Sequence, residues 1–137
     1  MPLGDVIVRE DFGSSSPEQI YRSKGYDVFS SNLKMDILVN QGSASAAEIL
    51  SGALQEHGIA KLVGTRTFGK GSVQQLLQIT PDTSLKITVA RWLTPDGISI
   101  SDNGLTPDYN VPMTDADVAA GKDPQMDKAI SLLDGTE

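Results

Sequence analysis

The chain has 137 residues, of which 39% are hydrophobic and 21% are charged, and it contains no cysteine. This length suits one globular domain with a single core, and the lack of cysteine excludes disulfides, thiolate metal sites and a cysteine nucleophile. Eleven basic against eighteen acidic residues give a net charge of −7, which argues against binding to nucleic acid or to an anionic membrane surface.

The first half of the chain alternates apolar runs with polar turns. VIVRE (6–10) predicts a strand, and the polar stretch DFGSSSPEQ after it predicts a hairpin tip or loop. IYRSKGYDVFSSN (20–32) has a weaker strand pattern, whereas KMDILVN (34–40) is the compact apolar run of a buried strand. Between Ser43 and Gly58, apolar residues recur at helical spacing, serines can cap the start and a glycine marks the end. This pattern predicts a helix.

The second half begins with KLVGT (61–65), which predicts a strand. SVQQLLQITP (72–81) fits either a short helix or a strand, and LKITVARWLT (85–94) alternates as a strand does. TPDG (94–97) predicts a turn, because proline presets the bend and glycine tolerates positive φ.

The last third is acidic and irregular from Asn103 to Lys122, and DPQMDKAISLLDG (123–135) then predicts an amphipathic helix with an aspartate cap. No repeat or linker divides the chain, so we expect residues 1–137 to form a single domain. Strand, helix and strand around residues 35–65 favour an α/β or mixed α+β fold.

GTRTFGKGS (64–72) is one residue away from a phosphate-binding loop, since Gly71 stands where a serine or threonine would bind magnesium. Such a loop also needs a helix directly after its lysine, and only the preceding strand is clearly predicted. A simple glycine-flanked surface turn is a further interpretation. A base role for Lys70 is another, because a lysine accepts a proton when it is neutral and burial favours that form. We expect Phe68 and the nearby apolar strands to bury it.

NQGSASAAE (40–48) ends a strand and opens a helix with two serines. Ser43 or Ser45 could simply cap the helix, or a serine could be a nucleophile on a tight turn from strand to helix, with the next amide facing an oxyanion. The only histidine, His57, lies twelve residues further on, about 18 Å along the helix, which excludes a Ser-His-Asp triad within the chain. His57 is better explained as a favourable charge near the helix end.

NQGSASAAEIL, TFGKGSVQQ, DGISISDNGLTPD and DPQMDKAI together resemble the carboxyl-terminal processing peptidases, or tail-specific proteases. The resemblance implies that Ser45 is the nucleophile and Lys70 its general base. It also implies that Gln74 orients the lysine and that the Ala46 amide donates to the oxyanion. Parity along an extended segment would place Lys70 and Gln74 on one face, and Ser43 is then expected to be a turn residue.

The chain also departs from the family's usual organisation. The resemblance implies a crotonase/ClpP-like α/β core, but no PDZ domain and no upstream glycine-rich turn for a second oxyanion donor are recognised in the sequence. We therefore expect the carboxyl-terminal portion of a peptidase catalytic domain, incomplete at its amino-terminal side. Glu56 stands where some members have an aspartate, and we expect a structural role for it at most.

The resemblance implies a serine endopeptidase that processes polypeptides near their carboxyl ends through an acyl-enzyme, without metal or cofactor. The expected partners are polypeptides with exposed carboxyl-terminal tails and, in a homo-oligomer, further copies of the chain. Nucleic acid and membrane contact by this segment are not expected, and the family implies an extracytoplasmic location. We expect the chain alone to hydrolyse peptides poorly. The alternative is a catalytically inactive scaffold or oligomerisation fragment of such a protease.

Overall fold

A computed structural model describes residues 1–26, 28–29, 33–101 and 103–136 of the chain. Its elements, in chain order, are β1 (Val6–Asp11), β2 (Gln19–Arg22), β3 (Asp36–Val39), α1 (Ala46–Glu56), β4 (Lys61–Gly64), β5 (Ser72–Thr80), β6 (Thr83–Leu93), β7 (Tyr109–Asn110), α2 (Asp115–Ala119) and α3 (Pro124–Asp134). The mixed α/β class predicted from the sequence is confirmed.

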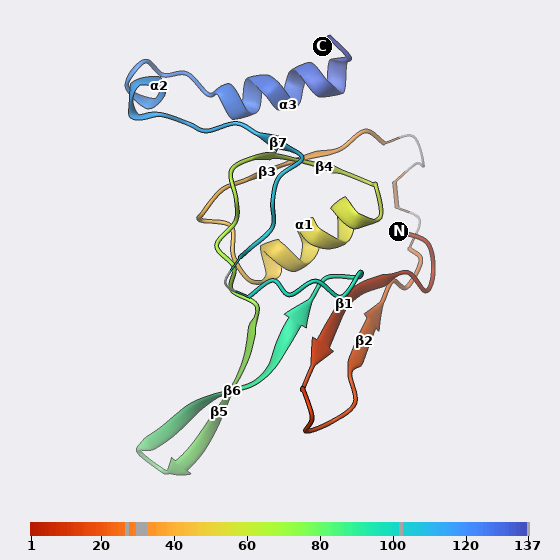
Figure 1. The fold of residues 1–137 in the computed structure, drawn as a ribbon, viewed down its shortest axis with the longest axis vertical. Helices are drawn as coiled ribbons and strands as arrows, with labels where there is room; N and C mark the ends of the chain where they lie inside the picture. Colours follow the sequence, from red (N-terminus) through yellow and green to blue (C-terminus); the bar gives the residue numbers. More distant parts are fainter. Residues whose placement is uncertain (27, 30–32, 102, 137) are drawn as a thin grey trace.

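The strands form two sheets with α1 between them (Figure 1). One sheet is antiparallel with the order β2-β1-β6-β5, and the other is parallel with the order β3-β4-β7. Helix α1 packs against β1 and β4, while α3 covers the other face of the parallel sheet, against β3 and β4. The tips of β5 and β6 extend away from these layers as a long hairpin (Figure 1).

The core lies where α1 meets the parallel sheet and the segment after β6. Its buried members are Val39, Leu62, Ile100 and Leu105, with Ile37, Ile49 and Trp92 packed against them. Trp92 of β6 also meets Tyr21 of β2 edge to face within the antiparallel sheet, with ring centroids 5.9 Å apart, so it connects that sheet to the core.

Most of the predicted elements are present. The helix predicted from Ser43 is α1, and the tail helix is α3, with Asp123 as its cap and Gly135 in the left-handed conformation at its end. The ambiguous segment 72–81 is the strand β5. The weak strand pattern of 20–32 holds only to Arg22, and part of that prediction, at 27 and 30–32, lies outside the described residues.

Two elements interrupt the tail that the sequence suggested was irregular. β7 has only two residues, Tyr109 and Asn110, and pairs in parallel with Val63 and Gly64. Helix α2 has five residues and begins at the cap Thr114. Both are too short to produce a periodic pattern in the sequence.

Candidate active site

Ser45 lies on the turn between β3 and α1, directly before the helix, and is exposed. Its backbone has φ 55° and ψ −116°, and it is the only non-glycine residue with positive φ in the described part of the chain. Such a conformation costs about 1–3 kcal/mol and persists only where the surroundings enforce it. A serine held in this way at the junction of a strand and a helix has the geometry of a nucleophile elbow.

The residues on either side of Ser45 have different roles: Ser43 belongs to a turn, and Ala46 begins the helix. The Ser43 hydroxyl accepts a 3.2 Å hydrogen bond from the Asn40 N–H, and the Ser43 N–H donates to the Asn40 carbonyl at 2.9 Å. The prediction that Ser43 is a turn residue is therefore confirmed. Ala46 is the first residue of α1, and an N–H in the first helical turn has no acceptor within the helix.

Lys70 belongs to residues 65–71, here called the lysine loop, which come directly after β4. Because β3 and β4 are parallel neighbours, the turn after β3 and the loop after β4 leave the sheet at the same edge. The Phe68 N–H donates to the Ser43 carbonyl at 3.0 Å. The fold thus brings the main chains of the two motifs together although Ser45 and Lys70 are 25 residues apart in sequence.

Glu48, which the sequence interpretation did not single out, joins these segments. Its side chain is fully buried. Oε2 accepts hydrogen bonds from the N–H groups of Ser45 and Lys70, both at 2.9 Å, and Oε1 accepts from the Thr67 hydroxyl at 2.5 Å and the Gly69 N–H at 2.7 Å. A sequence signal for Glu48 did exist, since Ser45 and Glu48 have the S-x-x-E spacing of a capping box.

The structure explains why both residues beside Lys70 are glycine. Gly69 has φ +86°, which a residue with a side chain rarely adopts. Gly71 is buried, and a Cβ there would lie 2.5 Å from the Ser101 nitrogen. Gly71 thus allows the main chain of the loop to approach the Ser101 main chain closely.

The burial expected for Lys70 is not found. Phe68 is 62% exposed, and Lys70 and Gln74 are exposed as well. Glu48 binds the Lys70 N–H, which leaves the lysine side chain directed to solvent. Gln74 lies in β5, but Lys70 precedes that strand, so the parity argument does not reach the lysine. Among the described residues, no hydrogen bond joins the side chains of Ser45, Lys70 and Gln74.

The phosphate-loop interpretation is contradicted by the segment after the lysine. The lysine loop leads into strand β5, which pairs with β6, whereas a phosphate-binding loop needs a helix whose N-terminus faces the anion. In the described part of the chain, no group of three or more acidic or histidine side chains is placed to hold a metal ion.

His57 and Glu56 lie at the other end of α1 from Ser45. His57 is the carboxyl-terminal cap of the helix, and its Nε2 lies 2.7 Å from the Val6 carbonyl oxygen, so this nitrogen is a donor. The Glu56 carboxylate accepts a 2.8 Å hydrogen bond from the Asp96 N–H. These contacts agree with structural roles for both side chains.

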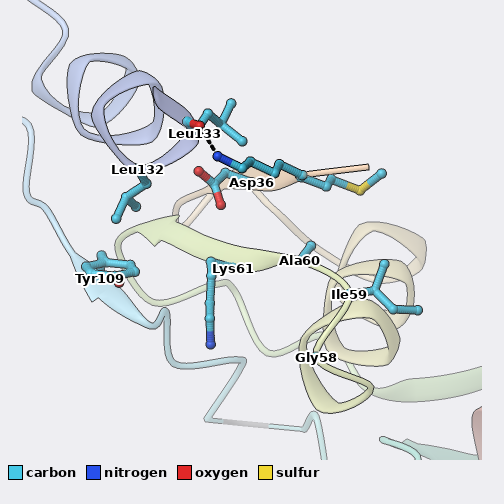
Figure 2. A pocket seen from close by; sticks show the side chains of 10 residues that line it. Asp36, Gly58, Ile59, Ala60, Lys61, Tyr109, Leu132 and Leu133 are labelled. Carbon is cyan, nitrogen blue, oxygen red and sulfur yellow. Dashed lines mark hydrogen bonds between the residues drawn. The ribbon is translucent and has the colours of Figure 1, made fainter. Parts of the chain in front are cut away.

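A pocket of about 370 Å³ lies at the opposite end of the parallel strands, where β3 and β4 begin (Figure 2). Asp36 lines it, and one carboxylate oxygen, Oδ2, is buried without a hydrogen-bond partner. Lys61 also lines it, but Figure 2 shows its ammonium group pointing away from Asp36, and it contacts Asp108 at 3.3 Å instead. This pocket is therefore separate from Ser45, which lies beyond the carboxyl end of β3.

Comparison with known sequences identifies relatives of the region that contains both motifs. The family model described as Peptidase family S41 matches residues 2–111. A "Probable CtpA-like serine protease" of Staphylococcus haemolyticus is 40% identical over 106 residues, which are 77% of this chain and 21% of that protein. A "Carboxy-terminal-processing protease" of Bartonella bacilliformis is 50% identical over 75 residues, 55% of this chain and 17% of that protein. The chain thus spans about a fifth of the length of these relatives.

Solved structures agree with this assignment. The photosystem II D1 C-terminal processing protease superposes with a TM-score of 0.74 at 34% identity, over 82% of this chain and 28% of that one. The tricorn protease shares the fold, with a TM-score of 0.61 at 23% identity, over 90% of this chain and 12% of that one. The resemblance to tail-specific proteases noted from the motifs is confirmed, and the chain belongs to peptidase family S41.

Proposed function

We propose that this chain carries the nucleophile and base of a serine endopeptidase that cuts polypeptides near their carboxyl ends. The single observation that carries the proposal is the strained, exposed backbone of Ser45 at the strand-to-helix turn, with the lysine loop bound beside it. The relatives' names, which describe carboxy-terminal processing, support the substrate class. An extracytoplasmic location rests on the family resemblance alone.

In the proposed reaction, Ser45 Oγ attacks the scissile carbonyl carbon while Lys70 Nζ takes the hydroxyl proton. The carbonyl oxygen becomes an oxyanion, to which the Ala46 N–H donates. Lys70 returns the proton to the leaving amine, which departs as the C–N bond breaks and the acyl-enzyme forms. Water then attacks the ester carbonyl while Lys70 takes its proton, and Lys70 passes this proton to Ser45 Oγ as the ester bond breaks, which releases the acid and restores Ser45 and the neutral Lys70. Gln74 is proposed to orient Lys70.

This mechanism requires the side chains to approach more closely than they do in the free chain. Lys70 and Gln74 are exposed, and catalytic hydrogen bonds are often long until substrate binds.

No helix in the described part of the chain is long and apolar enough to cross a membrane. Peptide hydrolysis with the Ala46 N–H as the single oxyanion donor is expected to be weak, because each donor contributes about 3–4 kcal/mol to transition-state stabilisation.

An activated p-nitrophenyl ester tests the proposal, because acylation by an ester with a good leaving group demands less of the oxyanion site. A burst of nitrophenolate, stoichiometric with the protein, is the expected sign of an acyl-enzyme. The burst should vanish in Ser45→Ala and persist in Ser43→Ala, which removes only a turn hydrogen bond. An equal burst in Ser45→Ala would refute the assignment of the nucleophile.

The second candidate is a catalytically inactive scaffold or oligomerisation fragment. The observation that favours it is the exposure of Lys70 and the lack of a hydrogen bond from it to Ser45 among the described residues. A folded wild-type chain that gives no burst, and whose Ser45 does not react with a serine-directed phosphonate, would establish this candidate over the peptidase.

A further inference from the structure

We propose that Glu48 is a positioning residue for the reaction, holding the nucleophile turn and the lysine loop in one fixed arrangement. The inference rests on the proposed function for its chemical meaning. Its structural basis stands separately, because the contacts involve only the main chain and Thr67. In the proposed reaction Glu48 has no direct contact with substrate and acts through Ser45 and Lys70.

The four partners of the carboxylate are all hydrogen-bond donors. Three are main-chain N–H groups, of Ser45, Gly69 and Lys70, and the fourth is the Thr67 hydroxyl. A carboxylate has about four acceptor sites when ionised and becomes a donor at one of them when protonated. The arrangement around Glu48 therefore matches the ionised side chain, which is acceptor at every position.

The Thr67 hydroxyl fixes the direction of this network. It accepts a 2.7 Å hydrogen bond from the Leu105 N–H, so its own proton is directed toward Glu48 Oε1. Thr67 is buried, and its N–H donates to the Leu105 carbonyl at 3.1 Å. The carboxylate is thus anchored to the segment after β6 as well as to the two motifs.

This arrangement accounts for two otherwise costly features. The positive φ of Ser45 needs an external constraint, and the hydrogen bond from its N–H to Glu48 supplies one. A buried carboxylate needs compensating donors, and it receives four of them near the positive end of the α1 dipole. Each motif therefore stabilises the other through Glu48.

Glu48→Gln is a sharp test because the amide has nearly the same shape but only one acceptor atom. If the NH₂ group faces the N–H groups of Ser45 and Lys70, both lose their acceptor. If the NH₂ group faces the Thr67 hydroxyl and the Gly69 N–H instead, the hydroxyl can turn and accept a hydrogen bond from it. The Gly69 N–H is only a donor and loses its acceptor. Every orientation leaves at least one main-chain N–H of the lysine loop unpaired.

Glu48→Asp tests the length of the side chain rather than its charge. It keeps the negative charge at the helix start, but it is one methylene shorter and cannot hold all four donors. Glu56→Gln is the matched control: it lies on the same helix, and its carboxylate also accepts a main-chain N–H, that of Asp96, far from the two motifs.

The first measurement is amide hydrogen exchange of Ser45, Gly69 and Lys70 by NMR, under conditions where every variant is folded. We expect exchange at Gly69 or Lys70 to be about tenfold faster or more in Glu48→Gln and Glu48→Asp, as the loss of a hydrogen bond of over 1 kcal/mol implies. Glu56→Gln should leave these three amides unchanged. Unchanged exchange in Glu48→Gln would overturn the inference, whether or not the chain is a peptidase.

The second measurement is the maximal rate of the nitrophenolate burst. A displacement of about 1 Å can reduce a rate on the order of 100-fold, so both Glu48 variants should acylate about 100-fold more slowly at saturating ester, with little change in the half-saturating concentration. Glu56→Gln should acylate at the wild-type rate. A wild-type rate in Glu48→Asp would overturn the inference, whereas the absence of a burst in the wild type would refute the proposed function and leave the exchange result to decide on Glu48.

Discussion

The Asp108 carboxylate accepts a 2.8 Å hydrogen bond from the N–H of Leu62, a fully buried residue in the middle of the parallel sheet. The same carboxylate also contacts the side chains of Gln55 and Lys61. It therefore binds together the end of α1, strand β4 and the segment that leads into β7.

Asp108 makes the stability of the fold sensitive to acid. Partial burial raises the pKa of this carboxyl, but hydrogen bonds from a main-chain N–H, an amide and an ammonium group outweigh it and hold the pKa below the usual 3.8. A lowered pKa stabilises the fold above the unfolded-state value, and this contribution is lost as pH falls through the folded-state value. Asp108→Ala should cost about 1–3 kcal/mol at neutral pH, because the Leu62 N–H loses its acceptor. Urea unfolding at pH 7 and below pH 3 should show the difference between wild type and variant shrinking in acid; a constant difference would contradict the prediction.

Asp36 should have the opposite effect. Burial raises the pKa of Asp36, as does the nearby negative charge of Asp108, while Lys61 acts against the shift. The ionised form is then disfavoured in the fold, so the wild type loses stability as pH rises from 3.8 through the raised value. Asp36→Asn should stabilise the chain at pH 7, by less than about 1 kcal/mol because the group is only partly removed from water.

Thermal unfolding at pH 7 and pH 3 measures this effect. The stabilisation by Asp36→Asn should fade at the lower pH, where the wild-type carboxyl is protonated. Asp82→Asn removes the same charge at an exposed position of the β5–β6 turn and should change little. A destabilised Asp36→Asn at neutral pH would mean that the carboxylate has a favourable partner in solution.

Gly71→Ala should destabilise the chain through steric overlap alone. The added Cβ would lie 2.5 Å from the Ser101 nitrogen and 3.0 Å from the Ile100 carbonyl carbon, and such overpacking costs about 1–3 kcal/mol. Gly121→Ala separates this effect from backbone strain, since Gly121 has φ +65° with open space around it and should cost only about 1 kcal/mol. The nitrophenolate burst should slow in Gly71→Ala and stay unchanged in Gly121→Ala. Equal bursts would show that the loop tolerates the shift.

The sequence predicted those parts of the fold that local patterns encode. The helix from Ser43 and the strands around 6–10, 34–40 and 61–65 have strong periodicity or compact apolar runs, and all are present. The pattern of segment 72–81 fitted both a helix and a strand, and its pairing with β6 makes it a strand. The two-residue β7 depends on a neighbour that is distant in sequence, so no local signal marks it.

In the candidate site, too, local motifs were predictable, whereas features that depend on residues distant in sequence were not. The motifs locate Ser45 and the lysine loop, and the structure brings their main chains together. Glu48 was missed because a glutamate in the first turn of a helix is ordinarily exposed, and only the return of the lysine loop buries it. The expected burial of Lys70 was wrong for the same reason, since a residue's exposure depends on which neighbours the chain brings to it.

The central claim, that Ser45 reacts because Lys70 accepts its proton, is tested most directly by phosphonate labelling with intact-mass measurement and peptide mapping. The wild type should gain one adduct, located on Ser45. Labelling of both Lys70→Ala and Lys70→Arg should be slower by about 100-fold or more, as expected for loss of a general base. Lys70→Arg is expected to fail because a guanidinium keeps the charge but does not deprotonate in this pH range. Labelling of Lys70→Arg at the wild-type rate, or an adduct on another serine, would contradict the proposed mechanism.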